Sequence, residues 1–167
     1  MGTQDASREV NVSAVRSTAV GKKRVSRKRS AEPSRLRFVG TQVTRERGSN
    51  LRIRVELERD GEAYSGDAAG VGLDTVELRL AVDATLAALR RAAPKAPAFR
   101  LVGIKRVHAF DADVVLVSLR EESGGRLLGA VAVEESLAEG AARAVLDATN
   151  RTLGRPSRAG RGEEESE

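Results

Sequence analysis

The sequence predicts an α+β domain of two pseudo-symmetric β-β-β-α repeats, with the helices segregated to one side of the sheets. An internal repeat is the first indication, because Val39-Gly40 recurs as Val102-Gly103, 63 positions further on. Ala81-Val82 recurs as Ala144-Val145 at the same spacing. Each copy also reads as three strands with a Gly-bearing turn, followed by an amphipathic helix. One copy alone could not bury its apolar face, so we expect the two copies to form a single domain.

In the first repeat, about residues 35–94, the first strand is predicted over Leu36–Arg45. Leu51–Glu58 then alternates apolar and charged residues, which is typical of a strand with one buried face and one wet face. Asp60-Gly61 favours a tight hairpin turn into a third strand over Glu62–Ala69. A helix follows from Asp74 to just before Pro94.

The first predicted helix has an N-terminal capping signal and a single apolar stripe. Asp74 is the expected N-cap, and Glu77 stands three residues on, as in a capping box. The stripe predicts which helix residues face the core. Its members are Leu78, Val82, Thr85, Leu86 and Leu89.

The second repeat, about residues 98–154, predicts strands over Leu101–Phe110, Val114–Leu119 and Arg126–Val133, with a Gly-Gly turn before the last. Val114–Val117 is apolar on both parities, which predicts a central strand covered on both faces. Ser136 and Glu139 form a second capping box, at the start of the last helix. The apolar side of that helix is expected to consist of Leu137, Ala141, Val145, Ala148 and Leu153.

The composition excludes several classes of protein. The 167 residues contain no Cys and one His, so we expect no disulfide, no thiolate nucleophile, no metal site and no cofactor. No apolar run approaches the roughly 20 residues of a membrane span, and the N-terminus has no signal-peptide core. We therefore expect a cytoplasmic protein that does not bind membranes.

The positive charge of the chain belongs to its N-terminal tail. Residues 1–34 lack apolar periodicity and are predicted to be a disordered basic tail. Residues 35–154 are predicted to form the single domain, and residues 155–167 a second disordered tail. One interpretation of the basic tail is a solvated leader. The other is an arm that binds nucleic acid non-specifically through phosphates, since no aromatic residue is present to stack on bases. The candidate nucleic-acid-binding residues of the arm are the clustered cations Lys22, Lys23, Arg24, Arg27, Lys28 and Arg29.

Residues 36–154 resemble the C-terminal regulatory domain of 2-isopropylmalate synthases and citramalate synthases. The resemblance rests on Gly70-Val71-Gly72 before the first helix, Gly129 in the last strand and the closing segment Ala142–Arg151. Leu73–Val76 departs from the Pro and Asp-Ala that usually follow the Gly-x-Gly of the family. No catalytic barrel precedes the domain, so we expect no synthase reaction and no enzymatic activity. The resemblance implies self-association, and sensing of a small amino-acid-like effector near the pseudo-two-fold axis.

Two segments at the helix starts are the candidate ligand site. Gly66, Gly70 and Gly72 precede the helix at Asp74, where backbone N–H groups favour an anion. The alternative interpretation of these glycines is tight strand-to-helix geometry. Their symmetry counterpart is Glu134-Glu135-Ser136, which would cap the second helix and, if an effector binds, could contact its amine. The candidate ligand-binding residues are Gly70, Gly72, Asp74, Glu135 and Ser136.

The remaining candidates for chemistry are isolated. His108 lies on an alternating strand without a partner base or nucleophile in its spacing, and is interpreted as a half-exposed strand residue. Asp111 and Asp113 could form a carboxylate pair, but a solvated turn explains them. We therefore predict no catalytic residues.

The second repeat is the more apolar copy, and we expect it to form a homodimer contact. Arg52, Arg54, Glu56 and Glu58 mark the wet face of the first repeat. Val114–Val117 and Leu127–Val133 are the expected contact segments. The sequence therefore predicts a non-enzymatic self-associating regulatory module, with a nucleic-acid-associated protein as the alternative.

Overall fold

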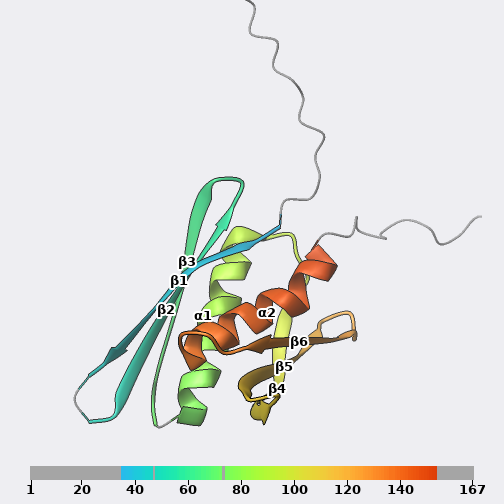
Figure 1. Cartoon of the computed structure of the whole chain (residues 1–167). Helices are drawn as coiled ribbons and strands as arrows, with labels where there is room; N and C mark the ends of the chain where they lie inside the picture. Colours follow the sequence, from blue (N-terminus) through green and yellow to red (C-terminus); the bar gives the residue numbers. More distant parts are fainter. Residues whose placement is uncertain (1–34, 47, 73, 154–167) are drawn as a thin grey trace, which may run out of the picture. The chain divides into compact units, whose positions relative to one another are not determined.

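The structure is a computed structural model that describes residues 35–46, 48–72 and 74–153, with the side chain of Asp74 excepted. The predicted tails at 1–34 and 155–167 lie outside these residues. The described part of the chain runs β-β-β-α-β-β-β-α (Figure 1). The order confirms the duplicated unit that the sequence predicts.

The strands form two separate antiparallel sheets of three. In sheet A the order is β1-β2-β3, and in sheet B it is β4-β5-β6. The strands of sheet A are β1 (Arg37–Arg45), β2 (Asn50–Arg59) and β3 (Glu62–Val71). Those of sheet B are β4 (Phe99–Ala109), β5 (Ala112–Glu121) and β6 (Arg126–Ala132).

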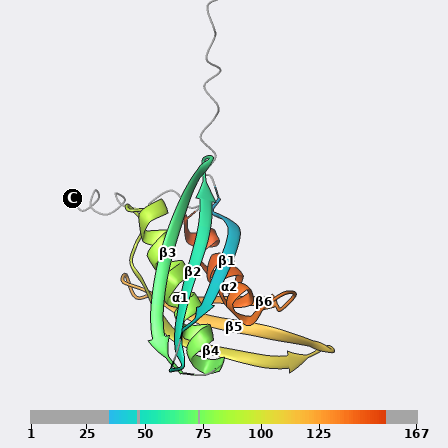
Figure 2. The same cartoon turned by 90° about the vertical axis from the view of Figure 1, so that its left-hand side faces the viewer.

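Each sheet is covered by a helix on one face only. Helix α1 (Asp74–Ala92) packs on β2 and β3, and helix α2 (Leu137–Leu153) packs on β5 and β6. The two helices contact each other and lie between the two sheets (Figures 1 and 2). The architecture is therefore α+β, with the helices on the inner side of both sheets. Neither helix combines the length and the apolar composition needed to span a membrane.

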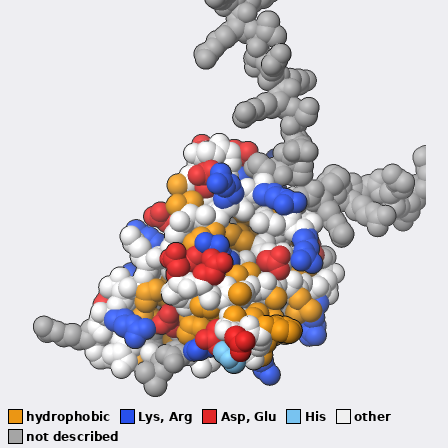
Figure 3. Space-filling view, in the orientation of Figure 1, with side chains coloured by type: hydrophobic (Ala, Val, Ile, Leu, Met, Phe, Trp, Pro, Cys, Tyr) orange, Lys and Arg blue, Asp and Glu red, His pale blue; other side chains and the backbone are white. Residues whose placement is uncertain are grey.

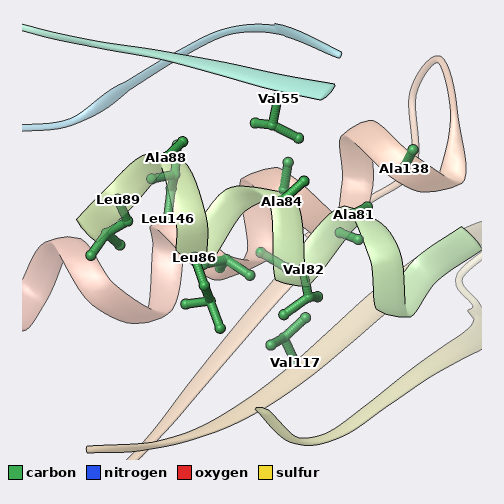
Figure 4. Close-up of a cluster of buried hydrophobic side chains, with 14 of the residues drawn as sticks. Val55, Ala81, Val82, Ala84, Leu86, Ala88, Leu89, Val117, Ala138 and Leu146 are labelled. Carbon is green, nitrogen blue, oxygen red and sulfur yellow. The ribbon is translucent and has the colours of Figure 1, made fainter. Parts of the chain in front are cut away.

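One apolar core joins both repeats through the helices. Figure 4 shows Val82 of α1 pointing toward Val117 of β5, while Ala84 points toward Val55 of β2. Val82 and its predicted counterpart Val145 are both fully buried, so the predicted core positions are confirmed. Helix α1 is buried on most of its circumference because it contacts sheets on two sides.

The repeated Val-Gly dipeptides mark a β-bulge in each copy. The register of β1 on β2 shifts between Phe38 and Gly40, and that of β4 on β5 shifts between Leu101 and Gly103. A bulge inserts one unpaired residue and reverses the alternation beyond it. Beyond the bulge in β1, Arg45 therefore lies on the inner face of sheet A, paired with Leu51.

Two glycines allow each helix to approach its sheet. A Cβ atom on Gly66 would overlap the carbonyl oxygen of Ala84, and one on Gly129 would overlap that of Ala144. The two glycines are 63 positions apart, but the two alanines are 60 apart. Measured from these close contacts, equivalent positions of the two helices are 60 residues apart, whereas the repeated Ala-Val dipeptides are 63 apart. The difference of three residues is about one helical turn.

The prediction that β5 is covered on both faces is wrong for the described chain. β5 is central in sheet B, and its inward residues Val115 and Val117 are buried. Its outward residue Leu116, however, is 42% exposed. The apolar residues of β5 therefore continue onto a face of sheet B that no described segment covers.

Candidate functional site

A hollow of about 130 Å³ lies where the β1–β2 turn meets the start of α1. Gly72 belongs to it, and the Gly72 N–H donates a hydrogen bond of 3.2 Å to the Ser49 carbonyl. Gly72 has φ +151°, and a Cβ there would overlap the Val76 side chain. Tight strand-to-helix geometry therefore requires glycine at this position. The hollow is lined by Arg45, Glu46, Ser49, Asn50, Leu51, Gly72 and Glu77.

A buried carboxylate and an arginine form an ion pair in this hollow. Glu77, in the first turn of α1, is 8% exposed, and its Oε2 accepts a hydrogen bond of 2.8 Å from Arg45 Nη2. A buried carboxylate is costly without a partner, which the inward-facing Arg45 of β1 supplies. The Arg45 side chain itself is mostly exposed. The carboxylate and the guanidinium that line the hollow therefore pair with each other.

A second hollow of about 270 Å³ adjoins the first and includes Gly70. It shares Glu46, Asn50 and Leu51 with the first hollow. Two of the predicted ligand residues, Gly70 and Gly72, are therefore brought to neighbouring depressions at one end of sheet A. The backbone of α1 begins at Asp74 as predicted, but the side chain of that residue is outside the description.

The second-repeat candidates do not join these hollows. Ser136 Oγ accepts a hydrogen bond of 3.1 Å from the Glu139 N–H, which confirms its capping role. The Glu139 carboxylate pairs instead with Arg143, at 2.7 Å, and Arg143 lies 5.2 Å from the centre of the Phe38 ring. Glu135 is exposed, and neither hollow is lined by Glu135 or Ser136. The expected symmetric pairing of both helix starts around one ligand is not seen in the described residues.

His108, Asp113 and Arg106 form an open cluster on the β4–β5 hairpin. Arg106 Nη2 lies 2.5 Å from Asp113 Oδ2, and His108 Nδ1 lies 3.3 Å from Asp113 Oδ1. The Arg106 guanidinium, and to a lesser extent His108, hold the pKa of the Asp113 carboxyl below its ordinary value. The solvated-turn interpretation is therefore wrong for Asp113, which lies in β5, while Asp111 does lie in the turn, at φ +59°.

This hairpin cluster offers no enclosed site for catalysis. The side chains of His108 and Arg106 are 71% and 47% exposed, and neither hollow described above includes them. The residues that the structure describes also contain no group of His, Asp and Glu that could hold a metal ion. The cluster is best explained as a surface ion-pair network.

The outer faces of the two sheets differ in chemistry. On sheet A the outward residues of β2 are the predicted charged ones, and Arg52 and Arg54 pair with Glu46 and Asp67. On sheet B most central outward positions are apolar, with Lys105 and Ser118 among them, and apolar side chains gather at the surface near the single histidine (Figure 3). The exposed apolar residues on the outer face of sheet B are Val107, Leu116, Leu128, Ala130 and Ala132, and the exposed cations on the same face are Arg100, Lys105, Arg120 and Arg126. Phe110, at the tip of the β4–β5 hairpin, is fully exposed.

The sequence analysis missed Arg45 and Glu77 as members of the hollow. Counting every second residue from the inward Phe38 places Arg45 outside, because the bulge at Val39 is invisible to such a count. The recurrence of Val39-Gly40 as Val102-Gly103 was the feature of the sequence that could have indicated the bulge. The basic residues 22–29, proposed as a nucleic-acid arm, lie outside the described residues.

No family model matches the chain, and no curated protein matches it either. The resemblance to the regulatory domain of 2-isopropylmalate and citramalate synthases therefore stays a prediction.

Proposed function

We propose that this chain is a non-enzymatic cytoplasmic regulatory module that forms a homodimer through the outer face of sheet B. The observation that carries the proposal is the contrast between the two repeats. They have the same architecture, yet the outer face of sheet A is charged, with Arg54 paired to Asp67 at 2.8 Å, and that of sheet B exposes Leu116 and Leu128. An exposed apolar patch of this kind is typical of an interaction surface.

The size of the patch supports a second copy as its occupant. Three strands at about 4.8 Å and six residues at about 3.3 Å give roughly 300 Å² of face per copy, of which Lys105 and Ser118 are the polar part. Burial of its apolar part on both copies would contribute at most about 15 kcal/mol, against an association cost of about 4–15 kcal/mol. The balance favours a reversible dimer. A two-fold arrangement would cover both apolar faces with one contact, which is the commonest arrangement of soluble homo-oligomers.

The test is sedimentation velocity of the full chain in which Leu116 and Leu128 are replaced by Lys. These outward side chains can be changed without loss of core packing, and we expect the variant to dissociate to monomers. The matched control carries two lysines on the other sheet, at the exposed positions Gln42 and Ala69, and should keep the mass of the parent chain. Equal dimerisation of both variants would refute the proposed surface.

We further propose that the hollow at Gly72 senses a small amino-acid-like effector. Glu77 would receive the ammonium group, and Arg45 would receive the carboxylate, with charge-assisted hydrogen bonds to each. Its volume of about 130 Å³ is below that of typical drug-sized pockets, which favours a ligand no larger than a single amino acid. Isothermal titration of the full chain with the individual amino acids tests this. Saturable binding that is lost in Glu77→Gln would support the proposal, and no binding by any amino acid would contradict it.

The alternative function is non-specific nucleic-acid binding through the basic arm. It is favoured by the six cations at positions 22–29, which would release counterions from phosphates. The test compares the affinity of the full chain for duplex DNA and RNA with that of a variant lacking residues 1–34. Salt-dependent binding that disappears with the deletion would favour this alternative, and no binding at ordinary salt would exclude it.

A further inference from the structure

Three arginines form a row across the outer face of sheet B. Arg100 of β4 pairs in register with Arg120 of β5, which pairs with Arg126 of β6. All three are exposed and lie on the same parity as Leu116, on the face away from the helices. Strands lie about 4.8 Å apart, so the row spans about 10 Å. Like charges directly opposite each other destabilise a sheet, so this arrangement has a cost that needs an explanation.

No carboxylate of the described residues neutralises the arginine row. On sheet A, in contrast, exposed arginines have partners, such as Arg37 with Glu58 and Arg52 with Glu46. Glu121 and Glu122 follow Arg120 in the chain, but neither forms an ion pair with the row. The row therefore presents three guanidinium groups that an external anion could bind bidentately.

Helix α2 runs along the inner face of sheet B toward the end of β6 that holds Arg126, and its last turn is hydrogen-bonded to Leu36 through Asn150. The start of α2 lies at one end of β6, where a Cβ on Gly140 would contact Val133. Further along, Ala144 lies against Gly129, so α2 runs antiparallel to β6. Its last residue, Leu153, is thus directed toward the end of the sheet that holds Arg126. In Figure 1 the end of α2 and the β5–β6 turn lie toward the same side.

The chain beyond α2 ends in an acidic segment. Residues 162–167 read Gly-Glu-Glu-Glu-Ser-Glu, with four glutamates and no cation, while the connecting residues before them include Arg155, Arg158 and Arg161. The nine residues 154–162 that connect this segment to α2 can span up to about 30 Å. Passing from the inner to the outer face of a sheet requires about 10 Å, so the segment can reach the row. A short tether also gives an effective concentration in the millimolar range.

We propose that Arg100, Arg120 and Arg126 bind the acidic segment Glu163–Glu167 of the same chain. Four carboxylates against three guanidinium groups neutralise the like-charge row, and the connection within one chain favours this occupant over a free anion. The contact covers the end of the outer face of sheet B. It does not depend on self-association, because a monomer contains both partners.

The experiment uses the full chain with one nitroxide label. The chain has no cysteine, so Ser166→Cys gives a single attachment point. We expect amide signals around residues 100, 120 and 126 to broaden at low salt and to recover at about 0.5 M NaCl, where the Debye length is only a few Å. The triple variant Arg100→Gln, Arg120→Gln, Arg126→Gln should lose the broadening.

Two controls complete the experiment. A variant with Gln at the exposed helix residues Arg79 and Arg90 should broaden as the parent chain does. In the second control, chains at natural isotope abundance that carry the nitroxide are mixed with isotope-labelled parent chains that lack it. Broadening in this mixture reports contacts between molecules. Broadening only in this mixture, broadening only at residues 22–29, or no broadening at low salt would each overturn the proposal. An added oligonucleotide tests whether the three arginines bind phosphate in preference to the acidic segment. If the signals stay broadened in its presence, the arginines prefer the acidic segment.

Discussion

Replacing Gly129 by Ala should destabilise the domain far more than the size of one methyl group suggests. The added Cβ would lie about 1 Å inside the 3.0 Å separation that real Cβ atoms keep, against the Ala144 carbonyl oxygen. The obstacle is the backbone of α2, which cannot rotate away as a side chain can. Helix and sheet must therefore separate by about 1 Å at this point.

The separation affects the best-packed part of the core. Gly129 pairs with Val117 on β5, and Val145 and Ala148 of α2 are buried beside it. Overpacking typically costs about 1–3 kcal/mol, and a backbone obstacle places this substitution at or above the upper end, near 3 kcal/mol. For a domain of this size that is a decrease in melting temperature of about 10 °C or more.

The assay is thermal unfolding of the full chain followed by circular dichroism, with a control from the same sheet. Gly103 lies in β4 with no atom within 4 Å of the position that a Cβ would take. Gly103→Ala should change stability by less than about 1 kcal/mol, and can raise it by restricting the unfolded chain. Equal melting temperatures for Gly129→Ala and Gly103→Ala would refute the close approach of α2 to β6.

Three further changes follow from buried or paired groups. Val145→Asn should cost about 3 kcal/mol or more in chemical unfolding, because it buries an amide at a position with no exposure, and an unchanged midpoint would remove Val145 from the core. Glu77→Gln should cost only about 1 kcal/mol in the same assay, since Arg45 stays solvated when its partner is lost, and a cost above about 3 kcal/mol would contradict this. The pKa of Asp113 is lowered in the fold, so its contribution is present above the ordinary aspartate pKa and is lost as pH falls through the folded value. The stability difference between the parent chain and Asp113→Asn should therefore shrink as the pH is lowered from neutral into acid, and a difference that stayed constant over that range would contradict this origin.

The order and nearly all bounds of the elements could be predicted because they depend on local signals. Alternation of apolar and charged residues predicted β2, the Asp60-Gly61 dipeptide predicted the β2–β3 turn, and Pro94 predicted the end of α1. Each of these signals acts over a few residues, and no tertiary contact overrode it. The apolar stripe of α1 was predicted from its helical spacing, but Leu80, Ala84 and Ala88 outside the stripe are buried as well, because α1 contacts both sheets.

The parts that the sequence did not predict depend on long-range geometry. The position of Arg45 beside Glu77 follows from a bulge that reverses the alternation of β1. The separation of Ser136 from the Gly72 hollow arises because each helix start packs within its own repeat, as the bond from Gly72 to Ser49 shows. The exposure of Leu116 could not be predicted either, since an apolar strand signals that a face is covered but not by what.

A second copy that covers the outer face of sheet B should shield its methyl groups from a soluble paramagnetic agent, and this shielding is measured by methyl relaxation. Leu128, on that face, and Val71, at the end of β3, have nearly equal exposure in one copy, 67% and 66%. As the concentration of the full chain rises through the micromolar range, the Leu128 methyl groups should become protected while those of Val71 stay accessible. Equal accessibility of both residues at every concentration, together with a monomer mass, would contradict the account.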